Sequence, residues 1–188
     1  MNETFDIKEK NKYLLALAEL SSDRFFKKLS AEEVFNIIKE SISVGEKLAD
    51  DIYNEFNERD TRKISERVGV RVLGSDNGGA KKSEYSAKEK NIIVYRDVVE
   101  RINAEITTQA LSDKILRILV GLELFSFFDE ERFGFFYKKF QFKLFLNFKF
   151  QVKKISNVVA KAFVHKLLEI EMTDEVFANL IYLYHLKI

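Results

Sequence analysis

The longest amphipathic pattern in the chain, between residues 30 and 57, restricts the fold more than any other feature. Its apolar members are Val34, Ile37, Ile38, Ile42, Leu48, Ile52 and Phe56. They recur mostly every three or four positions, so they share one face of an α-helix. Ser30, with Glu33 three residues later, forms a capping-box pattern at the start of this helix. The 188 residues include no proline that would interrupt it.

The rest of the chain mixes helical spacing with short alternating segments. Helical spacing predicts further helices over residues 7–29, 60–69 and 97–105, from Thr107 or Thr108 through Phe125, from Ile155 onward and from about Thr173. Alternation predicts strands from residue 70, over 82–87 and 91–96, and within 140–152. The predicted fold class is therefore α+β, with helices packed around a small, mainly antiparallel sheet.

Composition excludes several functional classes. The chain has no cysteine, which rules out disulfides, thiolate zinc sites and cysteine nucleophiles. Residues 1–10 lack the apolar segment of a secretory signal, and no stretch is long and apolar enough to span a bilayer. We therefore expect a cytoplasmic protein without a transmembrane segment.

Charge is unevenly distributed, although the net charge is only +1. Residues 132–154 carry seven basic side chains and no acidic one, and phenylalanines there alternate with polar residues that include Lys143 and Lys149. Alternation favours strands with one core-facing side and one solvated lysine side. The same pattern fits binding of nucleic acid or an anionic surface, which we do not favour. Phe145 interrupts the polar side and marks a second packing surface or a contact with a partner.

Several segments, taken in their order along the chain, suggest a relationship to known proteins. The segments are Gly45-Glu-Lys-Leu-Ala-Asp-Asp-Ile-Tyr, Asp60-Thr-Arg-Lys-Ile-Ser-Glu-Arg-Val-Gly-Val, Ser83-Glu-Tyr, Asn91-Ile-Ile-Val-Tyr, Leu122-Glu-Leu-Phe-Ser and Ile155-Ser-Asn-Val-Val-Ala-Lys-Ala-Phe-Val-His-Lys-Leu-Leu. Together they resemble the ImmA/IrrE family of bacterial metallopeptidases. The resemblance implies a zincin-like domain over residues 45–188, preceded by an N-terminal helical extension over residues 1–44.

The resemblance also implies which residues stand at the positions of the family's zinc site. Leu122 and Ser126 fall where the two zinc-binding histidines lie, Glu123 falls on the catalytic glutamate, and Asn157 falls on the glutamate ligand. Leucine has no donor atom for a metal, and serine and neutral asparagine are poor zinc ligands. We therefore expect neither zinc nor another cofactor, with Glu123 left as a vestigial base.

Three functions follow as hypotheses. The first is a non-catalytic pseudopeptidase that binds a protein partner. It would do so through the former cleft at Leu122, Ser126 and Asn157, or through the basic strand that carries Lys143, Phe145 and Lys149. A transcriptional regulator is the kind of partner that the resemblance implies. The second is a hydrolase with a relocated site around Glu123 and His165, aided by Glu169 or Asp129. The third is binding of nucleic acid or an anionic surface through residues 132–154.

Glu123 itself has two interpretations. Burial among its apolar neighbours would raise the pKa of its carboxyl group and leave it as a stranded base. Pairing with a lysine or arginine, or exposure to solvent, is the more common fate of such a residue, since buried acids are seldom left without a partner.

Overall fold

The computed structural model describes residues 6–76, 78–79, 81–105, 111–143 and 149–185. The fold is α+β, as predicted, with helices packed around a small sheet. The helices in the described part are α1 (Ile7–Ser21), α2 (Ala31–Phe56), α3 (Thr61–Arg67), α4 (Arg96–Glu105), α5 (Leu111–Phe128), α6 (Lys154–Leu167) and α7 (Asp174–His185). A short 3₁₀ turn, η1 (Phe26–Lys28), separates α1 from α2, so the helix predicted over 7–29 ends earlier than expected.

The three-stranded sheet is mixed rather than mainly antiparallel. Its strands β1 (Arg71–Ser75), β2 (Ser83–Ser86) and β3 (Asn91–Tyr95) lie in the order β1-β3-β2. The predicted hairpin makes β2 and β3 antiparallel, but β1 runs parallel to β3. The reason is that the loop after β1 crosses the end of β3, where a Cβ atom on Gly78 would lie only 2.5 Å from the Tyr95 ring. The chain therefore reaches the far edge of the sheet before it turns back.

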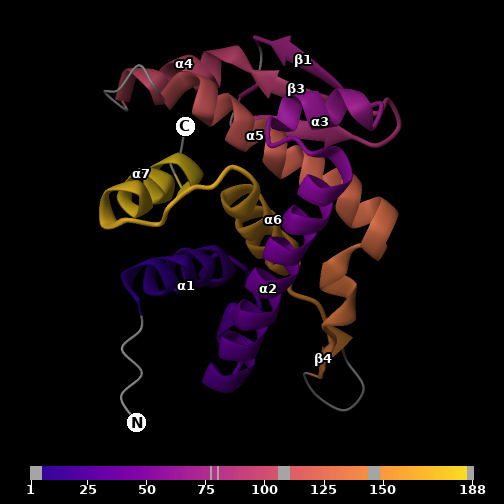
Figure 1. Cartoon of the computed structure of the whole chain (residues 1–188). Helices are drawn as coiled ribbons and strands as arrows, with labels where there is room; N and C mark the ends of the chain where they lie inside the picture. The colour runs from indigo at the N-terminus through magenta and orange to yellow at the C-terminus, as the bar shows by residue number, and fades with distance from the viewer. Residues whose placement is uncertain (1–5, 77, 80, 106–110, 144–148, 186–188) are drawn as a thin grey trace.

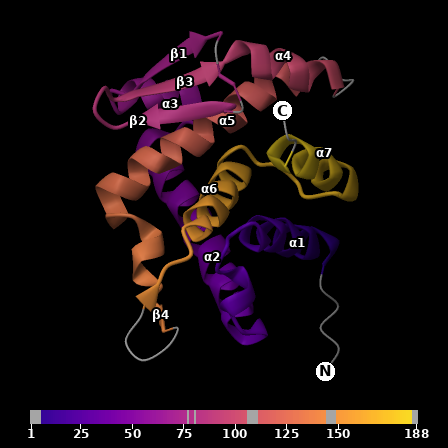
Figure 2. The ribbon, with the colours of Figure 1, turned by 180° about the vertical axis from the view of Figure 1, so that it is seen from behind.

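Helices α2 and α6 form the centre of the molecule. Figures 1 and 2 show α6 in the middle, with α2 alongside it and the sheet with α3, α4 and α5 at one end. The two helices approach closely at Gly45, where an added Cβ would lie 2.5 Å from the Val159 carbonyl oxygen. The amphipathic pattern that predicts α2 supplies its buried face, and the Ser30–Glu33 capping box is present.

Helix α1 packs against both α6 and α7, and Figure 1 shows α1 and α7 on the same side of α6. The Asn11 side-chain amide donates to the Met172 carbonyl oxygen at 3.0 Å and to the Asp174 carboxylate at 2.9 Å. These contacts tie the first helix to the last one. The boundary predicted between residues 44 and 45 falls inside α2, which is continuous there.

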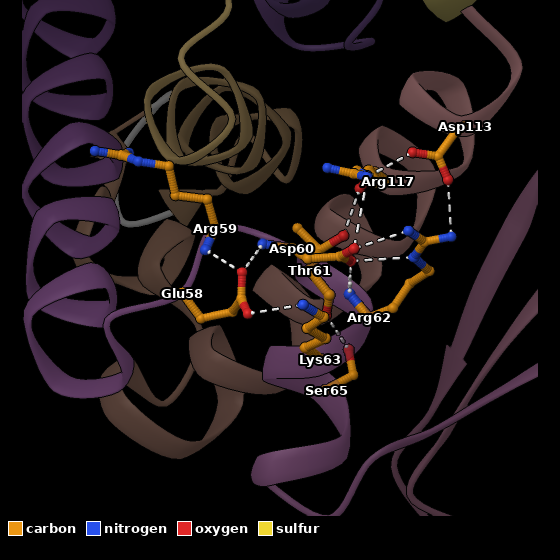
Figure 3. A network of polar contacts seen from close by, with 9 residues as sticks. All are labelled: Glu58, Arg59, Asp60, Thr61, Arg62, Lys63, Ser65, Asp113 and Arg117. Carbon is orange, nitrogen blue, oxygen red and sulfur yellow. Dashed lines mark hydrogen bonds and ion pairs between the residues drawn. The ribbon is translucent and has the colours of Figure 1, made fainter.

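A polar network fixes α3 to α5, the helix that carries Glu123 (Figure 3). Asp60 caps α3 by accepting from the Arg62 backbone amide at 3.0 Å. The Arg62 guanidinium contacts the carboxylates of Asp60 and Asp113, at 2.8 and 2.9 Å. The buried Thr61 hydroxyl donates to the Arg117 carbonyl oxygen at 2.8 Å. Helix α5 is therefore positioned by polar bonds to α3 as well as by apolar packing.

The aromatic segment after α5 folds back as a hairpin. A π-helical turn, η2 (Asp129–Phe133), and a 3₁₀ turn, η3 (Phe136–Lys139), lead to β4 (Phe142–Lys143), which pairs antiparallel with β5 (Lys149–Phe150). The rings of Phe142 and Phe150 lie 5.3 Å apart, and Phe150 is buried. Lys149 is exposed and donates to the Gln141 side chain at 3.0 Å. Lys143 is paired opposite Lys149 in the register, and Phe145 lies outside the described residues.

Within the described ranges, every helix is too short or too polar to cross a lipid bilayer.

Candidate functional site

A cavity of about 350 Å³ between α5 and α6 brings together the positions that the sequence singles out. Leu122, Glu123 and Ser126 reach it from α5, and Asn157 reaches it from α6. Residues four positions apart on a helix share one face, which is why Leu122 and Ser126 lie together. The rest of the lining consists of Phe125, Asp129, Phe135, Tyr137, Lys153, Ser156, Ala160 and Lys161.

Glu123 is mostly buried and is held by the edge strand β2. The Ser83 hydroxyl donates to its carboxylate at 2.8 Å, and the Tyr85 backbone amide donates to it as well. Burial raises the pKa of Glu123, and these two hydrogen bonds only partly oppose that effect. Among the described residues, Glu123 forms no ion pair with a lysine or arginine. The interpretation of a desolvated carboxyl group therefore fits the structure better than a salt bridge.

Asn157 faces a carboxylate from the N-terminal helix. Its side-chain amide donates to Glu19 of α1 at 2.8 Å. Glu19 is only 5% exposed and forms ion pairs with the ammonium groups of Lys161 and Lys154. Burial alone would raise the pKa of Glu19, but Lys161, Asn157 and Lys154 together lower it to about 2. A fully ionised carboxylate from α1 thus lies beside the position that the resemblance assigns to a zinc ligand.

His165 lies in a different place from Glu123. It lines a second cavity of about 570 Å³ between α1, α2 and α6, to which Glu123 does not contribute. The His165 Nε2 atom lies 2.9 Å from the Tyr184 hydroxyl, and burial lowers the pKa of the imidazole to about 3. Glu169 lines the same cavity as His165, and its exposed carboxylate pairs with Arg59 at 2.9 Å. The structure therefore does not bring Glu123, His165 and Glu169 into one catalytic arrangement.

Asp129 lines the same cavity as Glu123, but its carboxylate is already engaged. It accepts from the Phe136 backbone amide at 2.7 Å and from the Ser156 hydroxyl at 2.9 Å. Asp129 is 4% exposed, so solvent does not compete for these bonds. It joins the turn after α5 to the start of α6 and shapes one wall of the cavity.

The donor groups of the cavity do not form a metal centre. Over the described ranges, no three His, Cys, Asp or Glu side chains are grouped closely enough to hold a metal ion. Leu122 offers no donor atom, and the Ser126 hydroxyl faces the Leu122 carbonyl oxygen of its own helix at 3.5 Å.

Comparison of the chain with protein-family models, with curated proteins and with solved structures finds no match. The structure by itself defines an α+β protein with a cavity between α5 and α6.

Three residues at or beside the cavity, Glu19, Lys161 and Phe135, were not predicted from the sequence. The first two carried a signal, because each stands among apolar residues on the buried face of its helix, next to Leu20 and Ala160 respectively. A charged residue on such a face needs a buried partner. Phe135 follows Gly134, and only the structure shows that both adopt positive φ angles, of 74° and 58°.

Proposed function

We infer that the protein is a non-catalytic binding module whose cavity between α5 and α6 receives part of a protein partner. The observation that carries this proposal is the convergence of Leu122, Glu123, Ser126 and Asn157 on one cavity whose donor groups are unsuited to zinc. Such a convergence agrees with the resemblance to ImmA/IrrE peptidases, in which these positions form the catalytic cleft. A scaffold that keeps its cleft without the metal ligands retains a means of binding a polypeptide.

The engagement of the polar groups supports binding rather than catalysis. Glu123 is bound to β2, Asp129 is bound to the Phe136 amide and Ser156, and His165 lies in another cavity. A general base must reach the proton that it removes, and a nucleophile must lie next to its base. The two hydroxyl–carboxylate pairs here, Ser83 with Glu123 and Ser156 with Asp129, each join two secondary-structure elements, so we assign them to packing rather than to catalysis.

The test places a photoreactive amino acid at Ser126, inside the cavity, and in a matched variant at exposed Glu40 on α2. Crosslinking in cells of the source organism is followed by purification of any adduct specific to Ser126. The partner is then produced separately and titrated against the wild-type protein and a Ser126→Phe variant, which fills the cavity. We expect direct binding that Ser126→Phe weakens by at least about tenfold, as loss of a central contact does. Cleavage of the partner, or equal binding to both proteins, would refute the proposal.

A further inference from the structure

Phe135, at the rim of the cavity between α5 and α6, combines an exposed side chain with an unusual backbone conformation. The ring is 37% exposed, although phenylalanines elsewhere in this segment are mostly covered. Its backbone has φ 74° and ψ 99°, a strained conformation for a residue with a side chain. Such strain persists only where the surrounding structure enforces it.

Asp129 enforces the position of Phe135. The Phe135 backbone amide donates to the Asp129 carbonyl oxygen at 3.0 Å, and the next amide, of Phe136, donates to the Asp129 carboxylate at 2.7 Å. The carboxylate also accepts from Ser156 on α6. Because Phe136 is 1% exposed and anchors the turn in the core, Phe135 is left at the rim. The backbone at Phe135 is therefore fixed, with the exposed side chain beside the cavity.

The exposed basic groups at this rim are Lys138 and Lys153, whereas the carboxylates that line the cavity, Glu123 and Asp129, are mostly buried and hydrogen-bonded. The Lys138 ammonium lies 4.2 Å from the centre of the Phe135 ring, and Lys153 lines the cavity. Among the described residues, neither lysine forms an ion pair with an acidic side chain, whereas Lys8, Lys12 and Lys166 elsewhere on the surface all do. Glu130 and Glu131 of the preceding turn are exposed as well. Lys138 and Lys153 remain available to pair with an anionic group of a ligand.

We propose that the cavity binds an acidic peptide segment of its partner, with one large apolar side chain packed against Phe135 and Tyr137 and neighbouring carboxylates paired with Lys138 and Lys153. This inference rests on the proposed function and specifies its ligand class. Rigid aromatic anchors lose little entropy on binding and commonly dominate such interfaces. A recess beside an exposed ring receives a side chain, whereas nucleic acid is held along a basic groove with stacked bases.

The test selects a displayed library of random short peptides against the full-length protein, and measures the affinities of the enriched peptides by fluorescence anisotropy. We expect a motif with one large apolar residue flanked by Asp or Glu. Phe135→Ala should weaken binding by about tenfold. Lys138→Ala with Lys153→Ala should weaken it about as much and reduce its dependence on salt. Lys39→Ala with Lys47→Ala removes the same charge from the exposed face of α2 and should leave the affinity unchanged.

The outcomes separate the two proposals. Peptides without acidic residues that bind the wild type but not Ser126→Phe would overturn the acidic ligand and leave the binding function standing. Peptides that bind Phe135→Ala as well as wild type, or a failure to enrich any peptide, would also overturn the inference. Binding of single-stranded DNA or of anionic phosphatidylserine vesicles, in place of peptides, with loss in the double lysine variant would overturn it in favour of another ligand class. If Ser126→Phe changes the affinity for none of these ligands, the cavity is not the binding site and the proposed function is refuted as well.

Discussion

Glu19 of α1 and Lys161 of α6 form a buried ion pair whose members are 5% and 7% exposed. The pair lies beside Asn157 and joins the first helix of the chain to the wall of the cavity. Residues 1–44 are therefore not independent of the cavity, since their helix supplies a carboxylate next to it. The stability of α1 on α6 should depend on this contact.

Replacing Glu19 by glutamine should destabilise the protein by about 3 kcal/mol, because it leaves the Lys161 ammonium buried without its counter-charge. The free energy of unfolding in urea measures this effect. Glu171→Gln removes an exposed carboxylate that pairs with Lys8 and should change the stability little. Equal stability of the two variants would show that the Glu19–Lys161 pair does not hold α1 in place.

The low pKa of Glu19 also predicts how acid acts on this contact. The pKa is about 2 in the folded protein, against an ordinary value of 4.5. The stabilisation of the folded protein by ionised Glu19 is complete above the ordinary pKa and is lost as the pH falls through the folded-state pKa. Wild-type stability should therefore fall more steeply than that of Glu19→Gln between these two pH values.

Glu123→Gln should stabilise the folded protein near neutral pH. Burial raises the pKa of Glu123 in the folded protein. The contribution of its protonated carboxyl group to stability is therefore complete below the ordinary value of 4.5 and is lost as the pH rises through the folded-state pKa. Glutamine keeps an acceptor oxygen for Ser83 and does not ionise. The gain should vanish in acid, as measured by urea unfolding across the pH range. A gain that is independent of pH would contradict the desolvation of Glu123.

His165→Gln should make the protein less sensitive to mild acid. Burial, with help from Lys161 and Lys12, lowers the pKa of His165 from 6.5 to about 3. The unfolded chain therefore binds a proton that the folded protein does not, and stability falls as the pH drops through this window. The variant should show a shallower fall in melting temperature, while Lys166→Gln, an exposed change on the same helix, should keep the wild-type slope. Identical slopes for His165→Gln and wild type would exclude a buried neutral imidazole.

Gly45→Ala should destabilise the protein by about 2 kcal/mol, although alanine favours helix formation over glycine. The added Cβ would meet the Val159 carbonyl oxygen and the Phe163 backbone nitrogen, and backbone atoms cannot move aside at low cost. Ser43→Ala, at an exposed position of the same helix, should be neutral or slightly stabilising. Thermal unfolding of the two variants separates packing from helix propensity.

Local sequence patterns were sufficient to predict most of the helices and strands. The capping box at Ser30 and the apolar spacing after it predict α2 to within a residue at each end, because both act within single helical turns. The parallel pairing of β1 with β3 was missed because it depends on a loop that crosses the sheet, and loop direction is not encoded in alternation. Alternation in residues 140–152 predicts strands, and the structure has two short paired strands there, Phe142–Lys143 and Lys149–Phe150, while residues 144–148 lie outside the described residues.

The candidate site was predictable only in part. Spacing on α5 places Leu122 and Ser126 on one face, and the cavity contains both. The approach of Glu19 to Asn157 could not be derived, because it joins residues 138 positions apart through the docking of α1. The same limit applies to His165, whose distance from Glu123 is set by how α6 packs between α1 and α5.

Elemental analysis of zinc in protein purified without chelator, before and after incubation with zinc, tests the central claim most directly. A cavity lined by Leu122, Ser126 and Asn157, with no group of metal-binding side chains among the described residues, should hold only substoichiometric zinc, equal in wild type and Glu123→Gln. Stoichiometric zinc in the wild type that is lost in Glu123→Gln would contradict the claim and would indicate a metal centre built around Glu123.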